Sequence, residues 1–253
     1  MQSADIQINT FQEFMFHELE SLNLFANGQQ WLGEDFSFEE SQTFSFDFTD
    51  LNAAEPVQIR ARAVAVSSSN TQMNFMANGQ DLMNLNFSLI PNNSLTKASS
   101  AENEESIPLS TDKIDIQVVY NNNGNPSSRA YLDYIEIIGT KNLIARGKQF
   151  TFRNTSANNA SALYEYYIQN AANISQLWDV TDPLNSKRIP NESDGNDYVF
   201  KKFGGDHEFI ILGIDDFLTP EPIENNDVVN QNIHGLQDIE YAIISPSYLM
   251  SEA

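Results

Sequence analysis

The sequence contains no cysteine among its 253 residues. Within these residues there is therefore no disulfide, no thiolate metal site and no cysteine nucleophile. Basic residues are also scarce: 13 lysines and arginines stand against 35 aspartates and glutamates, which gives a net charge of −22. Because phosphates and anionic lipids are bound by clustered positive charge, this balance argues against nucleic acid or an anionic membrane surface as a partner.

Long apolar runs are missing as well. No stretch of 18 or more apolar residues is present, so we predict no transmembrane helix. The first residues, MQSADIQINTF, have neither the basic nor the apolar region of a signal peptide, and we expect any export signal to precede Met1. The last residues, IEYAIISPSYLMSEA, predict an apolar strand, a turn and the start of a helix. We therefore expect residues 226–253 to be the truncated first βα unit of an α/β domain, in a chain cut from a longer protein.

Between these ends the apolar residues recur at every second position, which is typical of half-buried strands. The pattern is formed by Phe44, Phe46 and Phe48, and then by Val57, Ile59, Ala61, Ala63 and Ala65. Asn78-Gly79 is a strong hairpin-turn dipeptide. In the later segment RAYLDYIEIIG the alternation places Leu132 on the face opposite Ile135. Repeated short strands with turn signals predict a jelly-roll-like β-sandwich over residues 34–143.

The rest of the chain gives weaker signals. Residues 1–33 show no clean period and are predicted to be irregular, with at most one short helix or strand. The polar segment 91–110 is predicted to be a loop. Residues 144–225 are predicted to form a second β-rich segment, with strands in QFTFRN, SQLWDVTDP, YVFKKF and HEFIILG. The predicted fold class is therefore mainly β, followed by the start of an α/β domain.

We assign no catalytic, cofactor-binding or metal-ligating role to any residue. The three histidines are isolated from one another and from any second ligand at a suitable spacing; they are His17, His207 and His234. We expect His207 to be exposed at a strand edge and His234 to satisfy backbone groups in a loop. The sequence also has no glycine-rich phosphate loop, no Gly-x-Ser-x-Gly and no His-Glu-x-x-His.

Adjacent acidic residues occur at three places, namely Glu39–Glu40, Glu104–Glu105 and Asp215–Asp216. A glycosidase needs two carboxylates that face one cleft, whereas neighbours in a strand point to opposite faces. We interpret the pairs as solvated, with a Ca²⁺ site near Asp215 and Asp216 as the minor alternative. Triplets of the form Asn-x-Ser/Thr are explained by chance in so asparagine-rich a chain; they begin at Asn86, Asn154, Asn159, Asn173 and Asn191.

A free-standing carbohydrate-binding jelly roll is an alternative function. It requires exposed aromatic side chains on one sheet face, and the candidates are Phe44, Phe46, Phe48, Tyr131 and Trp178. Core packing is the favoured use of all five. A third option, an acidic glycosidase, has no supporting motif.

Five segments in a fixed order carry a resemblance to a known family. They are HELESLNLFANGQQWLGEDF, RARAVAVSSSNTQMNFMANGQ, RAYLDYIEI, ISQLWDVTDP and NQNIHGLQDIEYAIISP. This set resembles the type IX secretion sortases of Bacteroidetes, the PorU family, which belong to the gingipain-like C25 peptidases. The match runs over nearly the whole chain, although each segment alone is weakly specific.

The resemblance implies an exported protein at the outer-membrane surface, in a family that cleaves C-terminal signals from secreted cargo. It implies as partners the rest of the peptidase chain, the cargo proteins and the secretion machinery. In the family a His–Cys dyad performs the chemistry deeper in the caspase-like domain, and His234 precedes that part. The resemblance therefore implies a non-catalytic N-terminal portion, with no catalytic residue to assign on this chain.

Overall fold

The computed structural model describes residues 3–24, 30–221 and 235, and these form strands and loops without an α-helix. No helix in this part of the chain is long and apolar enough to cross a membrane. The chain divides into two units, residues 1–217 and 218–253. The predicted βα unit and His234 lie outside the described residues. The domain boundaries predicted near residues 33, 143 and 225 stay predictions.

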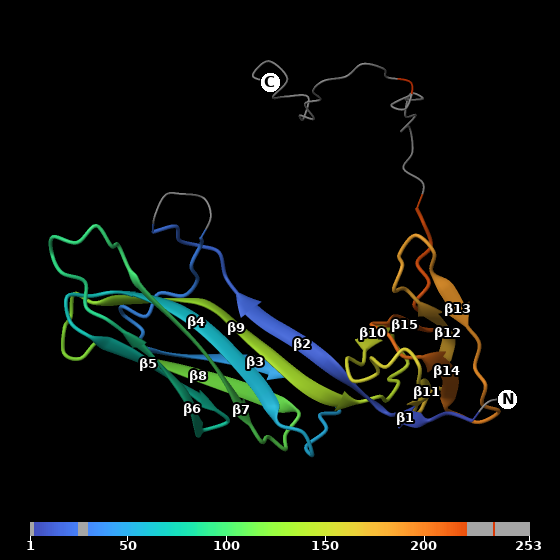
Figure 1. The fold of residues 1–253 in the computed structure, drawn as a ribbon. Helices are drawn as coiled ribbons and strands as arrows, with labels where there is room; N and C mark the ends of the chain where they lie inside the picture. The colour runs from blue at the N-terminus through green and yellow to red at the C-terminus, as the bar shows by residue number, and fades with distance from the viewer. Residues whose placement is uncertain (1–2, 25–29, 222–234, 236–253) are drawn as a thin grey trace. The chain divides into compact units, whose positions relative to one another are not determined.

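The first part of residues 1–217 is a jelly roll of two four-stranded sheets (Figure 1). One sheet has the order β2 (Thr10–Glu18), β9 (Arg129–Asn142), β4 (Val57–Val66) and β7 (Ser99–Ile107). The other has the order β3 (Ser41–Asp47), β8 (Lys113–Asn121), β5 (Thr71–Ala77) and β6 (Gln80–Phe87). Early and late strands alternate in both sheets, which is the jelly-roll connectivity and confirms the predicted fold class.

The core of the jelly roll lies between these sheets and is built from the residues of the period-2 pattern. Phe46 and Phe48 enter it from the segment of β3, and Ile59 enters it from β4. Ile116 and Val118 face them from β8. Burying one face of each strand removes apolar surface from water at roughly 25 cal/mol per Å², which drives the two sheets together.

A β-bulge corrects one prediction about β9. Arg62 pairs with Tyr134 while the next residue, Ala63, pairs with Leu132, so that Asp133 is an extra residue in the strand. The extra residue shifts the alternation, and Leu132 therefore packs in the same core as Ile135 rather than on the opposite face. Asp133 is only 6% exposed, and its carboxylate forms an ion pair with Arg62 at 3.3 Å.

Two further strands were not predicted. β2 lies in the segment predicted to be irregular, and its period is obscured because both of its faces carry apolar residues. β7 lies in the segment predicted to be a loop, and its sequence SSAENEESI has almost no apolar alternation. It pairs with β4, where Glu104 lies beside Arg60. An edge strand of this kind is stabilised by its neighbour, which local sequence does not reveal.

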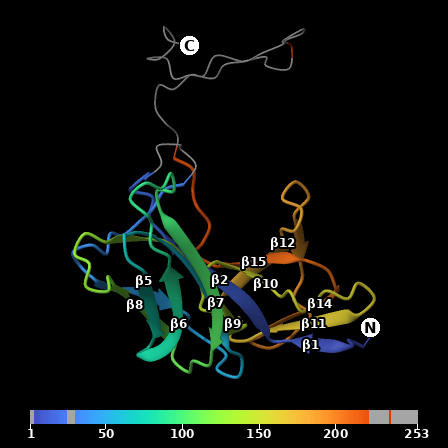
Figure 2. The ribbon, with the colours of Figure 1, turned by 60° about the vertical axis from the view of Figure 1, so that its left-hand side comes forward.

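The second part of residues 1–217 is a smaller β-sandwich (Figure 2). One sheet contains β1 (Ile6–Ile8), β11 (Leu163–Ile168) and β14 (Tyr198–Phe203). The other contains β10 (Phe150–Arg153), β15 (Glu208–Gly213), β12 (Ile174–Asp179) and β13 (Lys187–Ile189). The four strands predicted here are confirmed as β10, β12, β14 and β15, whereas β1, β11 and β13 were missed.

The consecutive strands β1 and β2 join the two sandwiches. β1 pairs with β11 in the smaller sandwich, and β2 continues into the jelly roll. Phe11 on β2 packs into the core of the smaller sandwich. The side-chain amide of Asn154 donates to the carbonyl oxygen of Thr10 at 2.8 Å. One continuous segment therefore takes part in both cores.

The hairpin turn between β5 and β6 gives a first test. Asn78 and Gly79 both have positive φ, 48° and 78°, as a two-residue type I′ turn requires. A Cβ at position 79 would meet no atom within 4 Å, so a substitution there would be disfavoured only by backbone conformation. We expect Gly79→Ala to lower the free energy of unfolding by about 1 kcal/mol in a urea titration. Asn78→Gly would keep the turn conformation but lose the side-chain hydrogen bonds of Asn78 to Thr111, Lys113 and Asp115, so it should be destabilising too. An unchanged stability in Gly79→Ala would contradict this assignment.

Candidate interaction surface

The two histidines among the described residues, His17 and His207, occupy structural positions. The Nε2 atom of His17 lies 2.6 Å from an oxygen of Glu34, and its ring packs on Phe44 at 4.6 Å between centroids. The Nε2 atom of His207 lies 3.0 Å from the carbonyl oxygen of Phe203. His207 is half-buried, so the expectation of an exposed edge residue was wrong.

The adjacent acidic residues do not converge on one point. Within the part of the chain that the structure describes, no three histidine, aspartate or glutamate side chains come together as metal ligands. Asp215 is exposed, and the Asp216 carboxylate instead accepts the backbone N–H of Gly213 at 2.6 Å. Glu104 lies on the surface of the jelly roll and accepts the side-chain amide of Gln58.

The five aromatic residues predicted as candidates do not form an exposed platform. Phe44, Phe46, Phe48 and Tyr131 are all buried. Trp178 is half-buried, and its indole N–H donates to the side-chain oxygen of Gln176 at 2.8 Å. Core packing, the favoured prediction, is thus the observed use of four of them.

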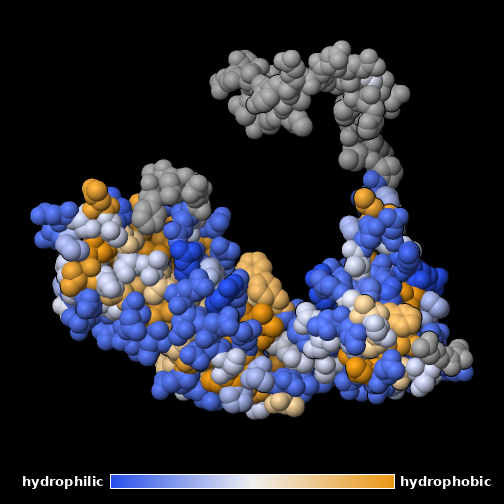
Figure 3. Space-filling model, viewed as in Figure 1, coloured by the Kyte–Doolittle hydropathy of each residue, from blue (hydrophilic) through white to orange (hydrophobic). Residues whose placement is uncertain are grey.

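A different set of apolar side chains is exposed on the outer face of the sheet β2–β9–β4–β7. Phe14 and Phe16 on β2 are 51% and 61% exposed, and Ile138 on β9 is 40% exposed. The two phenyl rings stack with centroids 6.0 Å apart. Phe14, Ile138 and Gln58 follow one another in register across three strands. We call Phe14, Phe16 and Ile138 the β2 patch; Figure 3 shows hydrophobic surface exposed over β2.

Beyond the β2 patch the same face carries a network of hydrogen-bonded, mostly charged side chains. The guanidinium of Arg60 donates to Glu136 at 2.7 Å and lies 5.7 Å from the centre of the Tyr134 ring. The Tyr134 hydroxyl donates to Glu102 at 2.9 Å. Burial is the larger cause and this hydrogen bond the next, and together they raise the pKa of Tyr134 to about 12. Tyr134 therefore keeps its proton, and its hydrogen bond to Glu102, throughout the physiological pH range.

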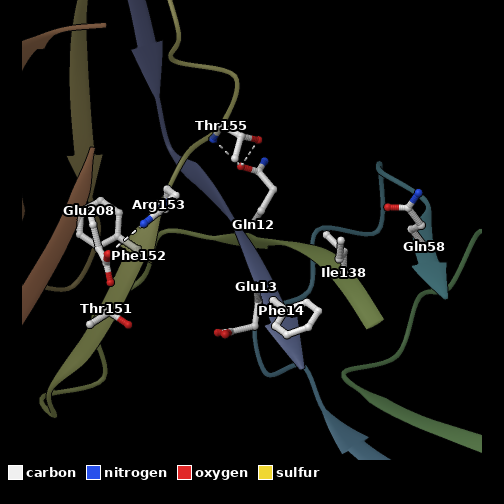
Figure 4. Close-up of a pocket in the computed structure, with 10 residues that line it drawn as sticks. All are labelled: Gln12, Glu13, Phe14, Gln58, Ile138, Thr151, Phe152, Arg153, Thr155 and Glu208. Carbon is white, nitrogen blue, oxygen red and sulfur yellow. Dashed lines mark hydrogen bonds and ion pairs between the residues drawn. The ribbon is translucent and has the colours of Figure 1, made fainter. Parts of the chain in front are cut away.

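A groove of about 550 Å³ adjoins the β2 patch (Figure 4). Gln12, Phe14 and Ile138 line it from the jelly roll, and Thr151, Arg153 and Glu208 line it from the smaller sandwich. Arg153 is paired with Glu208 at 2.9 Å. The side-chain oxygen of Gln12 accepts the backbone N–H of Thr155 at 2.9 Å. Both walls of the groove therefore combine apolar and polar side chains, as ligand-binding sites commonly do.

Sequence reasoning missed the β2 patch. A signal was available in TFQEFMFHE, where Phe14 and Phe16 alternate with Met15. Because Phe11 and Met15 are also apolar, however, the local pattern does not indicate which face is covered. The β2 patch and the adjoining groove, which share Phe14 and Ile138, form one continuous, partly apolar surface.

Comparison with known proteins gives an extensive structural likeness. No family model matches the chain, and no curated protein matches it. The crystal structure of dimeric latent PorU from Porphyromonas gingivalis superposes with a TM-score of 0.71 at 19% identity, covering 84% of this chain. This chain spans only 21% of that one. The carbohydrate-binding module CBM36 in complex with calcium and xylotriose is 12% identical; the match covers 51% of this chain and 99% of that chain, with a TM-score of only 0.30. CBM35 from Cellvibrio japonicus Abf62 is 13% identical; the match covers 53% of this chain and 95% of that chain, with a TM-score of only 0.29. By its fold, this chain is similar to about one fifth of PorU.

Proposed function

We propose that this chain is the non-catalytic N-terminal portion of a type IX secretion sortase-like cysteine peptidase. The observation that carries the proposal is the likeness to PorU, which covers 84% of this chain. The five ordered sequence segments support it independently, since they derive from residue identity rather than from backbone geometry. The chain has no cysteine, so a His–Cys dyad would be completed by residues beyond Ala253.

In this role the two sandwiches support the peptidase domain at the cell surface. The proposed partners are the rest of the peptidase chain, secreted cargo proteins and the secretion machinery. The net charge of −22 keeps such an exported module soluble. The exposed β2 patch supports a role in holding another polypeptide, because contiguous apolar surface next to a groove is typical of interaction sites.

Sequencing the gene beyond the codon for Ala253 tests the proposal. We expect the reading frame to continue into an α/β domain with a histidine and, later, a cysteine, each following an apolar strand. In the full-length protein, replacing that cysteine by serine should abolish cleavage of a peptide that carries a C-terminal signal. As a matched control, Phe38→Ala removes a fully exposed phenyl ring of this chain and should leave cleavage unchanged. A stop codon directly after Ala253 would overturn the proposal.

A glycan array discriminates the carbohydrate-binding alternative. We expect no strong binding, because four of the five aromatic candidates for a sugar platform are buried. Strong binding that is lost in Trp178→Ala would favour the carbohydrate-binding module instead.

A further inference from the structure

Strand β2 is an edge strand of its sheet. It is nine residues long and pairs only with β9 among the strands that the structure describes. The register between the two strands runs from Thr10 to Glu18 without a bulge. β2 also contains no proline and no lysine. It therefore lacks the proline, lysine and bulge that protect many sheet edges from pairing with another strand, although it carries Glu13 and Glu18. The opposite edge strand, β7, carries three glutamates.

The hydrogen-bonding direction along β2 follows from its neighbour. The N–H of Asn142 on β9 donates to Asp50, which lies on the side of β9 away from β2. In an antiparallel pair, two residues that face each other direct their peptide groups the same way, either both inward or both outward. Thr10, the partner of Asn142, therefore directs its peptide groups to the free edge, and its carbonyl oxygen indeed accepts from Asn154 there.

This alternation continues along the strand. Residues two apart share the same direction, so Gln12, Phe14, Phe16 and Glu18 also present their N–H and C=O groups at the free edge. The side chains of Phe14 and Phe16 stand on the outer face directly beside these groups, more than half exposed. The edge thus offers main-chain hydrogen bonds and an apolar surface at the same residues.

The charge around the edge is complementary to a basic partner. On β2 itself, Glu18 lies on the outer face and Glu13, paired with Lys141, lies on the opposite face, and the strand has no lysine or arginine. Farther across the outer face, Glu136 on β9 and Glu102 and Glu104 on the far edge strand β7 outnumber Arg60 and Arg62. Arg60 is bonded to Glu136, and Arg62 is paired with the buried carboxylate of Asp133. The excess is therefore negative, as it is for the whole chain. Complementary charge favours encounter with a partner and selects its register.

We propose that the free edge of β2 binds an extended, basic segment of another polypeptide as an added strand. The segment would alternate β-branched or aromatic residues, which lie beside Phe14 and Phe16 on the outer face, with lysine or arginine, which point to the opposite face, the side of Glu13. Main-chain hydrogen bonds to Phe14 and Phe16 supply affinity, and the alternate side chains supply specificity. Cβ atoms of paired residues would lie about 5 Å apart, within contact distance of the phenyl rings. The inference rests on the free edge and its charge, and does not depend on the proposed peptidase function.

The probe is a fluorescent nine-residue peptide of alternating lysine and valine, titrated into the 253-residue protein and followed by anisotropy. Two N-methylated versions carry the methyl groups on all valines or on all lysines. Because an added strand directs only alternate N–H groups to its neighbour, one version should lose binding while the other keeps it. A peptide with the same composition in blocks, and the same titration at high salt, control for attraction by charge alone.

Two substitutions separate the hydrogen bonds from the phenyl surface. Phe16→Pro removes an N–H that faces the free edge and leaves the bonds to β9 in place, as edge positions allow. Phe16→Ala keeps the N–H and removes the ring. We expect Phe16→Pro to abolish binding and Phe16→Ala to weaken it about tenfold, a change of about 1.4 kcal/mol. Phe38→Ala is the matched control for an exposed phenyl ring and should bind as the native protein does.

Three results would overturn the proposal. The first is equal binding by both N-methylated peptides, and the second is equal binding by the block peptide; either would indicate attraction by charge without strand addition. The third is a dimer in sedimentation velocity that Phe16→Pro dissociates, which would assign the edge to a second copy of this chain. The peptide arms of the experiment do not depend on whether Phe16→Pro folds.

Discussion

Replacing Phe209 by alanine is expected to lower the free energy of unfolding by about 3–5 kcal/mol, the range typical of a large aromatic side chain truncated in a core. Phe209 on β15 is fully buried at the centre of the smaller sandwich. Its ring lies 5.1 Å from that of Phe200 and 5.2 Å from those of Phe152 and Tyr166, between centroids. Truncation would remove contacts with all three rings and leave a cavity that the two sheets cannot close.

Urea unfolding followed by tryptophan fluorescence measures this effect. The chain has two tryptophans, and a Trp31→Phe background leaves Trp178 on β12 as the reporter of the smaller sandwich. Phe203→Ala is the matched control, since the same ring is half exposed at the end of β14 and should change stability by no more than about 0.5 kcal/mol. If Phe209→Ala were no more destabilising than Phe203→Ala, the assigned core would be wrong.

The second large effect is expected for Lys202→Met. The ammonium of Lys202 lies 2.5 Å from the carboxylate of Asp179, which is 8% exposed. Thr181 also donates its hydroxyl to this carboxylate, at 2.6 Å. Methionine would leave the buried carboxylate without its counter-ion. We expect a loss of about 2–3 kcal/mol at pH 7, below the usual range for a buried pair because Lys202 itself is partly solvated.

The pH dependence of this loss follows from the pKa of Asp179. Burial alone would raise that pKa, but the hydrogen bonds from Lys202 and Thr181 outweigh it and hold the pKa below its ordinary value. The stabilisation is therefore present above the unfolded-state pKa of about 3.9 and is lost as the pH falls through the lower folded-state pKa. The difference between native protein and Lys202→Met should accordingly shrink when urea titrations are repeated at successively lower pH below about 4.

A double substitution provides the control. Asp179→Asn combined with Lys202→Met removes the charge as well as its partner, so it should be less destabilised than Lys202→Met alone. Lys148→Met, at an exposed lysine just before β10, should be nearly neutral. Equal losses in the single and double variants would show that the pair contributes through packing rather than charge.

Much of the fold was predictable because the jelly roll expresses its pattern locally. Phe44, Phe46 and Phe48 alternate with polar residues, and Asn78-Gly79 has the turn residues that a hairpin requires. Period-2 alternation reports that a strand has two unlike faces, and several such strands with turns between them restrict the fold to a sandwich or barrel. These signals needed no knowledge of distant contacts.

The strands that were missed have a different physical origin. β7 has polar residues on both faces and is held by pairing with β4. In β11, Leu163, Tyr164, Tyr166 and Ile168 are buried, so its sequence does not alternate cleanly. The bulge at Asp133 depends on a register between β4 and β9, which are separated by more than 60 residues. Each of these features depends on contacts with a strand that is distant in the sequence, and the local residue pattern does not indicate which strand that is.

Composition and residue pattern were enough to establish the absence of cysteine from these residues, their strongly acidic character and the β-sandwich class. Whether each apolar side chain is buried or exposed depended instead on the packing of the sheets. Phe48 lies fully buried between two sheets, while Phe16, in an equally apolar strand, is exposed. The physical reason is that alternation defines two faces of a strand but not which face another sheet will cover. For the same reason, only the strand order leaves β2 at an edge, where its phenyl rings and free peptide groups form one surface.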